Sequence, residues 1–317
     1  MFSPKLTKNN HFRYFYDDIP FSFRKAASQS FSTSHGRVSR SIKSWKQECL
    51  IAADEIHQSF SKPIQILFSG GLDSEVVVRS FVEAGITPEI YIIEFEDELN
   101  KHDIDYAKRA CQSMGLSFNT LKLNLFNFWQ GPVWDYARPV GVCSPQLAVI
   151  LWAVNQLDGT VVLGAGDGYF RRDEGSNIFY DYESEISYSL YRWFVYKQKE
   201  SVPAFFQYSS ELMLSFCLDS KVLRFLRDGK SRGLLSSQRI KHELYSQHFE
   251  LEFRVPQNGF EKVQVQDKNL RDEMLKSFPG SDQIYRVNAY RYIQSFGGDL
   301  PMDFDSYFVN FQNLQKP

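Results

Sequence analysis

The chain has 317 residues, enough to bury a large core, and its 43% hydrophobic and 23% charged residues are ordinary for a globular protein. The formal net charge of −2 excludes a strong attraction of the whole molecule to nucleic acid or to an anionic membrane. The four cysteines form no CxxC pair, which excludes a zinc ribbon or a disulfide scaffold and favours a reducing, cytoplasmic location. The chain starts without an apolar signal core and has no apolar run that could span a bilayer, so we expect no membrane partner.

The beginning of the chain is unusually basic. Residues 1–46 carry nine Lys or Arg and two acidic residues, a formal charge of +7. We expect residues 1–60 to form a basic N-terminal extension that ends in a helix from about Ser44 to Phe60. Such a segment can steer a nucleic acid toward the protein, or it can be a solvated, mobile arm. The sequence leaves both alternatives open.

Apolar and amphipathic segments alternate from residue 61 onward. The segments expected as strands are 64–68, 89–95, 118–125 and 160–163. Helices are expected after Ser74, after Asn100 and after Ser144. Asn100 can cap its helix, and Pro145 lies in the first turn of the third one, where proline is tolerated.

This alternation predicts an α/β fold with a doubly wound, mainly parallel sheet whose ligands bind at the carboxyl ends of the strands. We expect its core to span residues 61–185. Beyond about residue 185 the pattern becomes helical and aromatic, with candidate helices near 209–227 and 236–249. Residues 186–317 are therefore expected to form a helical region on the substrate side.

The most informative motif is Ser69-Gly70-Gly71-Leu72-Asp73-Ser74, directly after the first strand. Two adjacent glycines allow a sharp turn and let backbone N–H groups approach an anion. The hydroxyls of Ser69 and Ser74 add donors, and a helix start adds partial positive charge, so the segment predicts a phosphate cradle. Asp73 stands where a Walker loop has a lysine, and a carboxylate beside phosphates implies a divalent cation between them. The alternative is a tight strand-to-helix turn that binds nothing.

A second glycine-rich loop, Gly164-Ala165-Gly166-Asp167-Gly168, follows the fourth expected strand. Its glycines permit close approach of the backbone, and Asp167 lies at the carboxyl end of a strand, as Asp73 does. Two acids at neighbouring strand ends, both facing one phosphate cradle, predict a magnesium site. A glycine-rich turn that ends in a capping aspartate is the alternative.

The first motif resembles the SGGxDS signature of the PP-loop ATP pyrophosphatases, which cleave ATP to AMP and pyrophosphate while they activate a substrate. The second loop is similar to the LSGEGADE loop of the synthetase-domain branch that contains asparagine synthetases and β-lactam synthetases, although it is one residue shorter and lacks the glutamates. The resemblance implies a five-stranded sheet of the adenine nucleotide alpha hydrolase type, with ATP and Mg²⁺ as cofactors. It implies Asp73 and Asp167 as metal ligands and the following nucleotide-binding residues: Ser69, Gly70, Gly71, Asp73, Ser74, Phe95, Gly164 and Gly166.

A later segment, Phe253–Phe260, is similar to the R-P-K-x-G-F segment of synthetase domains, whose lysine contacts phosphate and stabilises the transition state of adenylation. Gln257 stands in the place of that lysine when Gly259-Phe260 sets the register. Lys262 and Lys241 are near enough in sequence to supply the missing charge, and solvated surface lysines are the alternative for both.

Arg254 is the other candidate in this segment. A guanidinium can hold two phosphate oxygens at once, which makes a phosphate contact the expected role. The alternative is an ion pair with Glu250 or Glu252. Arg254 and Lys262 are therefore the predicted catalytic residues.

We expect no glutaminase domain of the kind that asparagine synthetases have, because Phe2 follows Met1 and 60 residues cannot hold that domain. Nitrogen would come from ammonia, from a substrate amine or from a separate amine-donor protein. We expect an ATP-dependent, AMP- and pyrophosphate-forming ligase that adenylates a carboxylate or carbonyl oxygen for attack by ammonia or an amine. Two alternatives stay open: an enzyme of the same superfamily that modifies a nucleic acid or nucleobase, and a non-catalytic nucleotide-binding subunit. The acceptor substrate, a small molecule or a nucleobase, has no readable code.

Overall fold

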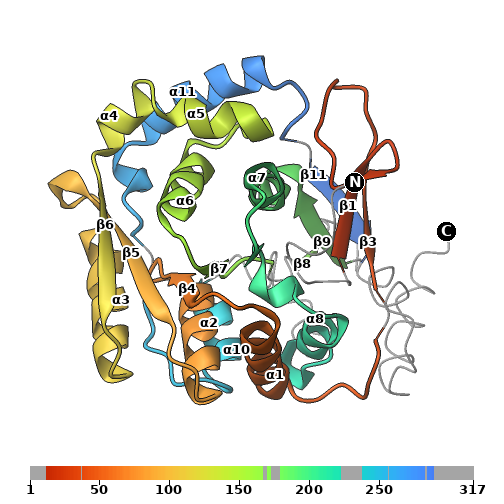
Figure 1. Ribbon diagram of the computed structural model, residues 1–317, viewed down its shortest axis with the longest axis vertical. Helices are drawn as coiled ribbons and strands as arrows, with labels where there is room; N and C mark the ends of the chain where they lie inside the picture. Colours follow the sequence, from red (N-terminus) through yellow and green to blue (C-terminus); the bar gives the residue numbers. More distant parts are fainter. Residues whose placement is uncertain are drawn as a thin grey trace.

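The computed structural model describes residues 12–36, 38–166, 170–172, 179–222, 238–255, 257–282 and 284–288. Its central element is a five-stranded sheet with the order β10-β7-β4-β5-β6, in which all neighbouring strands are parallel (Figure 1). The strands are β4 (Ile64–Leu67), β5 (Glu89–Phe95), β6 (Phe118–Leu123), β7 (Thr160–Val162) and β10 (Ser201–Val202). This confirms the predicted α/β fold with a doubly wound, parallel, five-stranded sheet.

The order of the strands changes direction at β4. From β4 the chain adds β5 and β6 on one side, and then β7 and β10 on the other. The switch point therefore lies between β4 and β7, and in such sheets it is the place where ligands bind.

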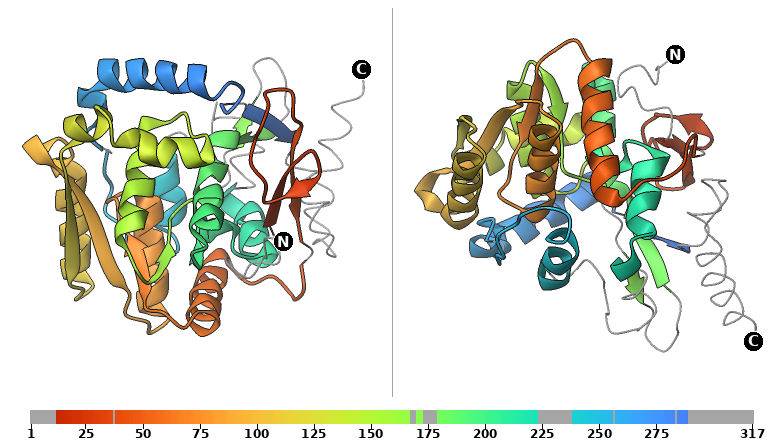
Figure 2. Two further views of the ribbon diagram at one scale, coloured as in Figure 1. Left: turned by 45° about the horizontal axis from the view of Figure 1, so that its top comes forward. Right: turned by 90° about the horizontal axis from the view of Figure 1, so that it is seen from below.

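Helices cover both faces of the sheet, because alternate residues of the strands point to opposite sides. Ile66 and Val162 belong to one buried cluster, and their neighbours Leu67 and Val161 belong to the other. The first cluster includes side chains of α1 (Trp45–Ser59), α2 (Leu72–Glu83), α3 (Lys101–Ser113), α8 (Ser210–Cys217) and α10 (Gln238–Tyr245). The second includes side chains of α4 (Leu125–Trp129), α5 (Val133–Ala137), α6 (Pro145–Gln156), α7 (Ser189–Lys197) and α11 (Gln264–Ser277) (Figure 2).

The helix starts follow local sequence signals. Ser44 and Gln47 form a complete capping box at α1, and Ser144 caps α6 by accepting a hydrogen bond from the N–H of Leu147. The 3-10 helices are η1 (Glu96–Glu98), η2 (Arg138–Val140), η3 (Glu185–Tyr188), η4 (Phe205–Gln207) and η5 (Phe260–Lys262).

The predicted N-terminal extension contains a small antiparallel sheet that the sequence did not predict. Its strands are β1 (Phe12–Tyr16), β2 (Ile19–Pro20) and β3 (Phe31–His35), in the order β2-β1-β3. It lies at the end of the molecule away from β6 (Figures 1 and 2). Side chains of β1 are buried in one aromatic cluster with Tyr188 and Tyr191. The alternative of a mobile, solvated arm is therefore wrong for residues 12–36.

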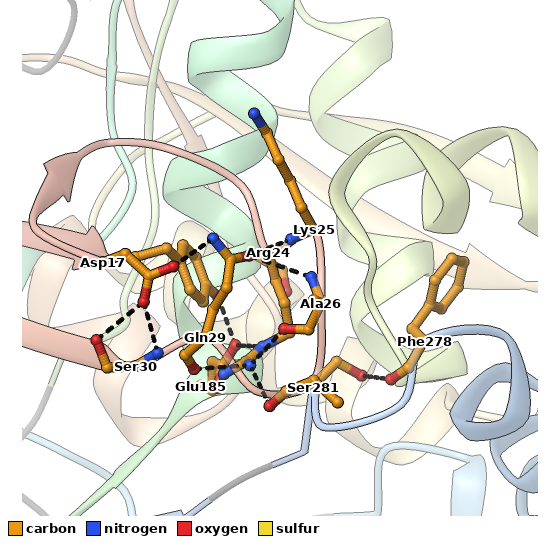
Figure 3. A network of polar contacts seen from close by, with 12 residues as sticks. Asp17, Arg24, Lys25, Ala26, Gln29, Ser30, Glu185, Phe278 and Ser281 are labelled. Carbon is orange, nitrogen blue, oxygen red and sulfur yellow. Dashed lines mark hydrogen bonds and ion pairs between the residues drawn. The ribbon is translucent and has the colours of Figure 1, made fainter.

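A polar network fixes this sheet to the rest of the molecule. Arg24 donates from Nε and Nη2 to the two carboxylate oxygens of Glu185, both at 2.7 Å (Figure 3). The hydroxyl of Tyr16 donates to the same carboxylate at 2.5 Å. The side chain of Glu185 is fully buried, so these donors compensate a charge that would otherwise be costly to bury.

The region after residue 185 contains strands as well as helices. Besides α7, α8, α10 and α11 it contributes β10 to the central sheet and β11 (Ile284–Asn288) to a second small sheet. That sheet has the order β11-β9-β8, with β8 at Phe170–Arg172 and β9 at Phe179–Ser184, and it is antiparallel. The described part of residues 186–317 is thus largely helical, as expected, and contains two strands in addition.

Within the described residues no single helix is both long and apolar enough to cross a membrane. One bent helix pair, Val133–Val140 with Pro145–Gln156, meets the length and composition criteria only when its two parts are joined across a 98° bend.

Candidate functional site

The two predicted loops meet at the switch point of the sheet. Ser69–Ser74 follows β4 and Gly164–Gly166 follows β7, and these strands are parallel neighbours, so both loops emerge at the same edge. A Cβ atom on Gly164 would lie 2.9 Å from the backbone N of Ser74, closer than real Cβ atoms come. Glycine at position 164 therefore lets the second loop lie directly on the start of α2.

Gly70 allows a second close approach. Its φ of +82° is in the left-handed region, and a Cβ atom there would lie only 2.1 Å from the carbonyl oxygen of Asp103 in α3. The first loop thus turns against the beginning of α3. No other residue type fits at position 70 without a shift of one backbone against the other.

The two serine hydroxyls hold the shape of the first loop. Ser74 donates to the carbonyl of Gly71 at 2.9 Å, and Ser69 Oγ accepts from the N–H of Gly71 at 3.2 Å. The hydroxyls themselves lie 3.0 Å apart. Ser69 is exposed, whereas Ser74 is buried. Of the two, Ser69 is the one that an incoming ligand meets first.

The start of α2 is suited to bind an anion. Its N-cap, Gly71, has no side chain and makes no capping hydrogen bond. The N–H groups of a first helical turn have no partner within the helix, and they carry the positive end of the helix dipole. A phosphate at the exposed side of Ser69 would supply the missing acceptors.

Asp73 forms a buried ion pair that the sequence did not reveal. Lys241 Nζ lies 2.5 Å from Asp73 Oδ2, and the hydroxyl of Tyr245 donates to Oδ1 at 2.9 Å. The side chain of Lys241 is 6% exposed and that of Asp73 is 24% exposed. The alternative of a solvated surface lysine is therefore wrong for Lys241. The one available signal was weak: Lys241 and Tyr245 are four residues apart and share one face of a helix.

The predicted magnesium site is only partly within the described residues. Asp167 lies outside them, so its position relative to Asp73 is not part of the structure. Both carboxylate oxygens of Asp73 already accept hydrogen bonds, from Lys241 and Tyr245. Among the described residues no group of three or more His, Cys, Asp or Glu is placed to hold a metal ion. The described residues do not fit a metal site, and the roles of Asp73 and Asp167 as metal ligands stay predictions.

Arg254 has a partner other than those considered from the sequence. Its Nη1 lies 2.5 Å from Oε2 of Glu75 in α2, and both side chains are almost fully buried. The expected alternative partners, Glu250 and Glu252, do not form this pair. Glu75 also binds Arg79 at 2.8 Å. A role of Arg254 at a phosphate stays a prediction, and its observed contact fixes the segment around residue 254 to α2.

The segment after Arg254 packs against the beginning of α3, near the first loop. The N–H of Gln257 donates to Oδ1 of Asp103 at 2.7 Å, and Asp103 is the residue whose carbonyl lies against Gly70. A Cβ on Gly259 would lie 2.9 Å from the carbonyl of Leu99. Lys262 is exposed and donates to the same carbonyl at 2.7 Å. Gln257 therefore lies close to the first loop, Ser69–Ser74. Lys262 instead binds the backbone of the turn after β5.

Phe95 ends β5 as predicted, but its backbone N–H already has a hydrogen-bond partner. The side-chain oxygen of Asn100 accepts from the N–H of Phe95 at 2.9 Å, and the Asn100 amide donates to the carbonyl of Ile93 at 2.9 Å. Asn100 therefore sits at the N-cap position of α3 without capping it through its side chain, contrary to expectation. The Phe95 ring is buried against Phe260. The role of Phe95 in binding the nucleotide stays a prediction.

Comparison with known proteins gives only distant likenesses. No protein-family model and no curated protein matches the chain. Among solved structures, an NMN synthetase from Francisella tularensis matches with 16% identity and a TM-score of 0.29, over 37% of this chain and 52% of its own. An NH3-dependent NAD synthetase from Campylobacter jejuni matches with 10% identity and a TM-score of 0.32, over 81% and 97% of the two chains.

A glutamine-dependent NAD+ synthetase from Acinetobacter baumannii matches with 10% identity and a TM-score of 0.32, over 86% of this chain and 52% of its own. This chain thus spans about half the length of the first and third of these proteins. Likenesses at this level assign no activity, and the function has to be argued from the site.

Proposed function

We propose that this chain binds ATP at Ser69–Ser74 and cleaves it to AMP and pyrophosphate while it activates a second substrate. The observation that carries the proposal is the contact between the two loops at the switch point, with Gly164 against Ser74. It places an uncapped helix start, two glycines and two hydroxyls at the edge of the sheet where ligands bind. The resemblance of the first loop to the SGGxDS signature supports ATP as the anion.

The proposed reaction is of the asparagine synthetase type. An oxygen of the substrate's carboxylate or carbonyl group attacks the α-phosphorus of ATP, and pyrophosphate leaves with the electrons of the broken P–O bond. Ammonia or an amine then attacks the activated carbon and displaces AMP. The protein contributes mainly positioning and donors for the negative charge on the phosphates, and the loop amides and Ser69 are suited to this task.

Magnesium is the second cofactor predicted from the sequence. We keep it in the proposal as the ion that accompanies ATP in solution. When bound, a divalent cation neutralises charge between phosphate oxygens. As a ligand, Asp73 would share its carboxylate oxygens with Lys241 and Tyr245, which already donate to them. For that reason no step of the proposed reaction depends on a metal held by the described residues.

The acceptor is proposed to be a small molecule or a nucleobase, with ammonia, a substrate amine or a separate amine-donor protein as the source of nitrogen. Binding of a nucleic acid through the basic N-terminal region has less support. Arg24, Arg40 and Lys46 are paired with Glu185, Glu48 and Glu83. Their charge is therefore largely compensated within the fold.

A second candidate function is nucleotide binding without turnover. The observation in its favour is the engagement of both Asp73 oxygens by Lys241 and Tyr245. Such a protein would bind ATP and release it unchanged, so turnover separates the two candidates.

The test is the formation of AMP and pyrophosphate from ATP over a panel of carboxylic acids, amines and nucleobases, together with ATP–pyrophosphate exchange. We expect exchange with at least one acid. Ser69→Asp should reduce it at least about tenfold, because a carboxylate at an exposed loop position repels the phosphates. Ser69→Asn has nearly the same size without the charge and should retain most of the activity. Binding of ATP without any turnover would favour the second candidate, and absence of binding would overturn both.

A further inference from the structure

Lys241 places a buried positive charge at the predicted phosphate loop. Its ammonium group lies 2.5 Å from Oδ2 of Asp73, the second residue of α2. The position is fixed from the side of α10, because Tyr245, one turn later, binds the other carboxylate oxygen. The Tyr245 ring is held in turn by Trp45 of α1, with the ring centroids 4.7 Å apart. Three helices thus define where this charge lies.

The charge balance of the loop depends on this contact. A carboxylate alone beside the start of α2 would repel phosphates and counteract the helix dipole. Paired with Lys241, the Asp73 carboxylate has a positive charge beside it at the start of α2, which favours an anion there. An ammonium carries three donors, so it can bind a carboxylate and a phosphate oxygen at the same time. The Lys241 side chain is only 6% exposed, so water screens its interactions less than those of a surface lysine.

We propose that Lys241, rather than a metal ion held by Asp73, is the cation that this protein supplies to the phosphates at Ser69–Ser74. The inference rests on the proposed function and deepens it. It means that the pyrophosphate part of the ligand binds without a divalent metal. Asp73 acts as a positioning residue that holds the ammonium at the loop.

The experiment is calorimetric titration of the full chain with pyrophosphate and with ATP, each in EDTA and in excess Mg²⁺. We expect wild type to bind pyrophosphate in EDTA, with a dissociation constant that Mg²⁺ changes little. Lys241→Met keeps the length of the side chain and removes the charge. It should weaken binding in EDTA at least about tenfold, the effect of losing one charge-assisted hydrogen bond. Lys241→Arg should retain most of the affinity.

A second set of binding measurements tests whether Lys241 and Asp73 act together. In Lys241→Met the Asp73 carboxylate no longer has the ammonium group beside it, so Mg²⁺ should restore much of the binding. Lys241→Met combined with Asp73→Asn should bind more tightly in EDTA than Lys241→Met alone and should no longer respond to Mg²⁺. Lys268→Met is the matched control, since Lys268 is exposed on α11 and pairs with Asp272 instead. It should bind like wild type under both conditions.

Two results would overturn the inference. Pyrophosphate binding by wild type only when Mg²⁺ is present would show that a metal is the cation, and this measurement does not depend on the folding of any variant. Equal or tighter binding by Lys241→Met in EDTA would show that Lys241 merely covers the loop. If wild type binds neither ligand under either condition, the proposed function fails first and the inference fails with it. Binding of ATP that needs Mg²⁺ would leave the proposed function intact and overturn the inference alone.

Discussion

At the scale of single residues, the glycines of the candidate site are explained by close packing as well as by a ligand. Gly70 and Gly164 lie where a Cβ atom would collide with the backbone of α3 and α2, at 2.1 Å and 2.9 Å. Gly115 also has a positive φ, of +68°, but nothing lies within 4 Å of the position where its Cβ would be. Glycine is therefore required at positions 70 and 164 because neighbouring backbone leaves no room for a Cβ atom. At position 115 it is required only by the backbone conformation of the residue itself.

This difference predicts the effect of alanine at each site. Gly115→Ala should lower the free energy of unfolding by about 1–2 kcal/mol, the cost of the left-handed conformation. Gly70→Ala adds a collision with the Asp103 carbonyl and should cost about 2–5 kcal/mol in total. Urea denaturation of both variants measures the two values. Equal losses in both would contradict the close approach of the first loop to α3.

At the scale of secondary structure elements, four strands of the central sheet were predictable because each lies in an apolar or alternating segment bounded by turn residues. The segment 89–95 was predicted with the bounds that β5 has, and the start of α6 follows its serine cap and proline. β10 could not be located, because two residues carry no periodicity. The β1–β3 sheet was not predicted, because the net positive charge of residues 1–46 suggested a basic arm. The buried residues of β1 are its alternating aromatic ones.

The site was predictable only where its residues are adjacent in the sequence. The motif located the first loop, and the βα pattern located the second loop beside it. The contact of Lys241 with Asp73 joins residues 168 positions apart, and no local pattern encodes such a pairing. The same holds for Arg254, whose partner Glu75 is far away along the chain. Asn100 shows a third limit, because a residue typical of a helix cap can bind a neighbouring strand instead.

One further pairing between elements makes stability depend on pH. Asp219, just beyond α8, binds His248, just beyond α10, at 2.9 Å, and it accepts the N–H of Lys221. Burial acts to raise the pKa of Asp219, but these hydrogen bonds outweigh it and hold the pKa below its usual value. A carboxyl group whose pKa is lowered in the folded state stabilises the fold above its unfolded pKa of about 3.9 and loses this contribution as the pH falls through the folded pKa.

Asp219→Asn should therefore lower the free energy of unfolding at neutral pH by roughly 1–3 kcal/mol, the range for hydrogen bonds to a charged group. The difference from wild type should shrink below about pH 4, where the wild-type carboxyl becomes protonated. Urea denaturation as a function of pH tests this. Asp105→Asn changes an exposed aspartate of α3 and serves as the control with a profile like that of wild type. A difference that is constant over the whole pH range would contradict the role of the Asp219 charge.

At the scale of the whole molecule, the candidate site is built from parts of the chain that are distant in sequence. The first and second loops, the Lys241–Tyr245 face of α10 and the segment at Gln257 contribute to it or lie against it. The helices among these parts, α2, α3 and α10, contribute to the same buried cluster on one face of the sheet. A ligand that holds them together stabilises the fold as a whole rather than one segment of it.

ATP should therefore raise the free energy of unfolding of the entire chain. Binding only to the folded state contributes RT ln(1 + [ATP]/Kd), which is about 2.7 kcal/mol at about 100 times Kd. Calorimetry should show an unfolding transition that moves to higher temperature as ATP increases, with circular dichroism and tryptophan fluorescence giving the same midpoint. Adenosine lacks the phosphates and should produce a much smaller shift, because the loop at Ser69–Ser74 binds the phosphate part. Equal shifts with adenosine would place the main contact elsewhere. Two transitions of which only one responds to ATP would contradict the coupling of the whole fold through the site.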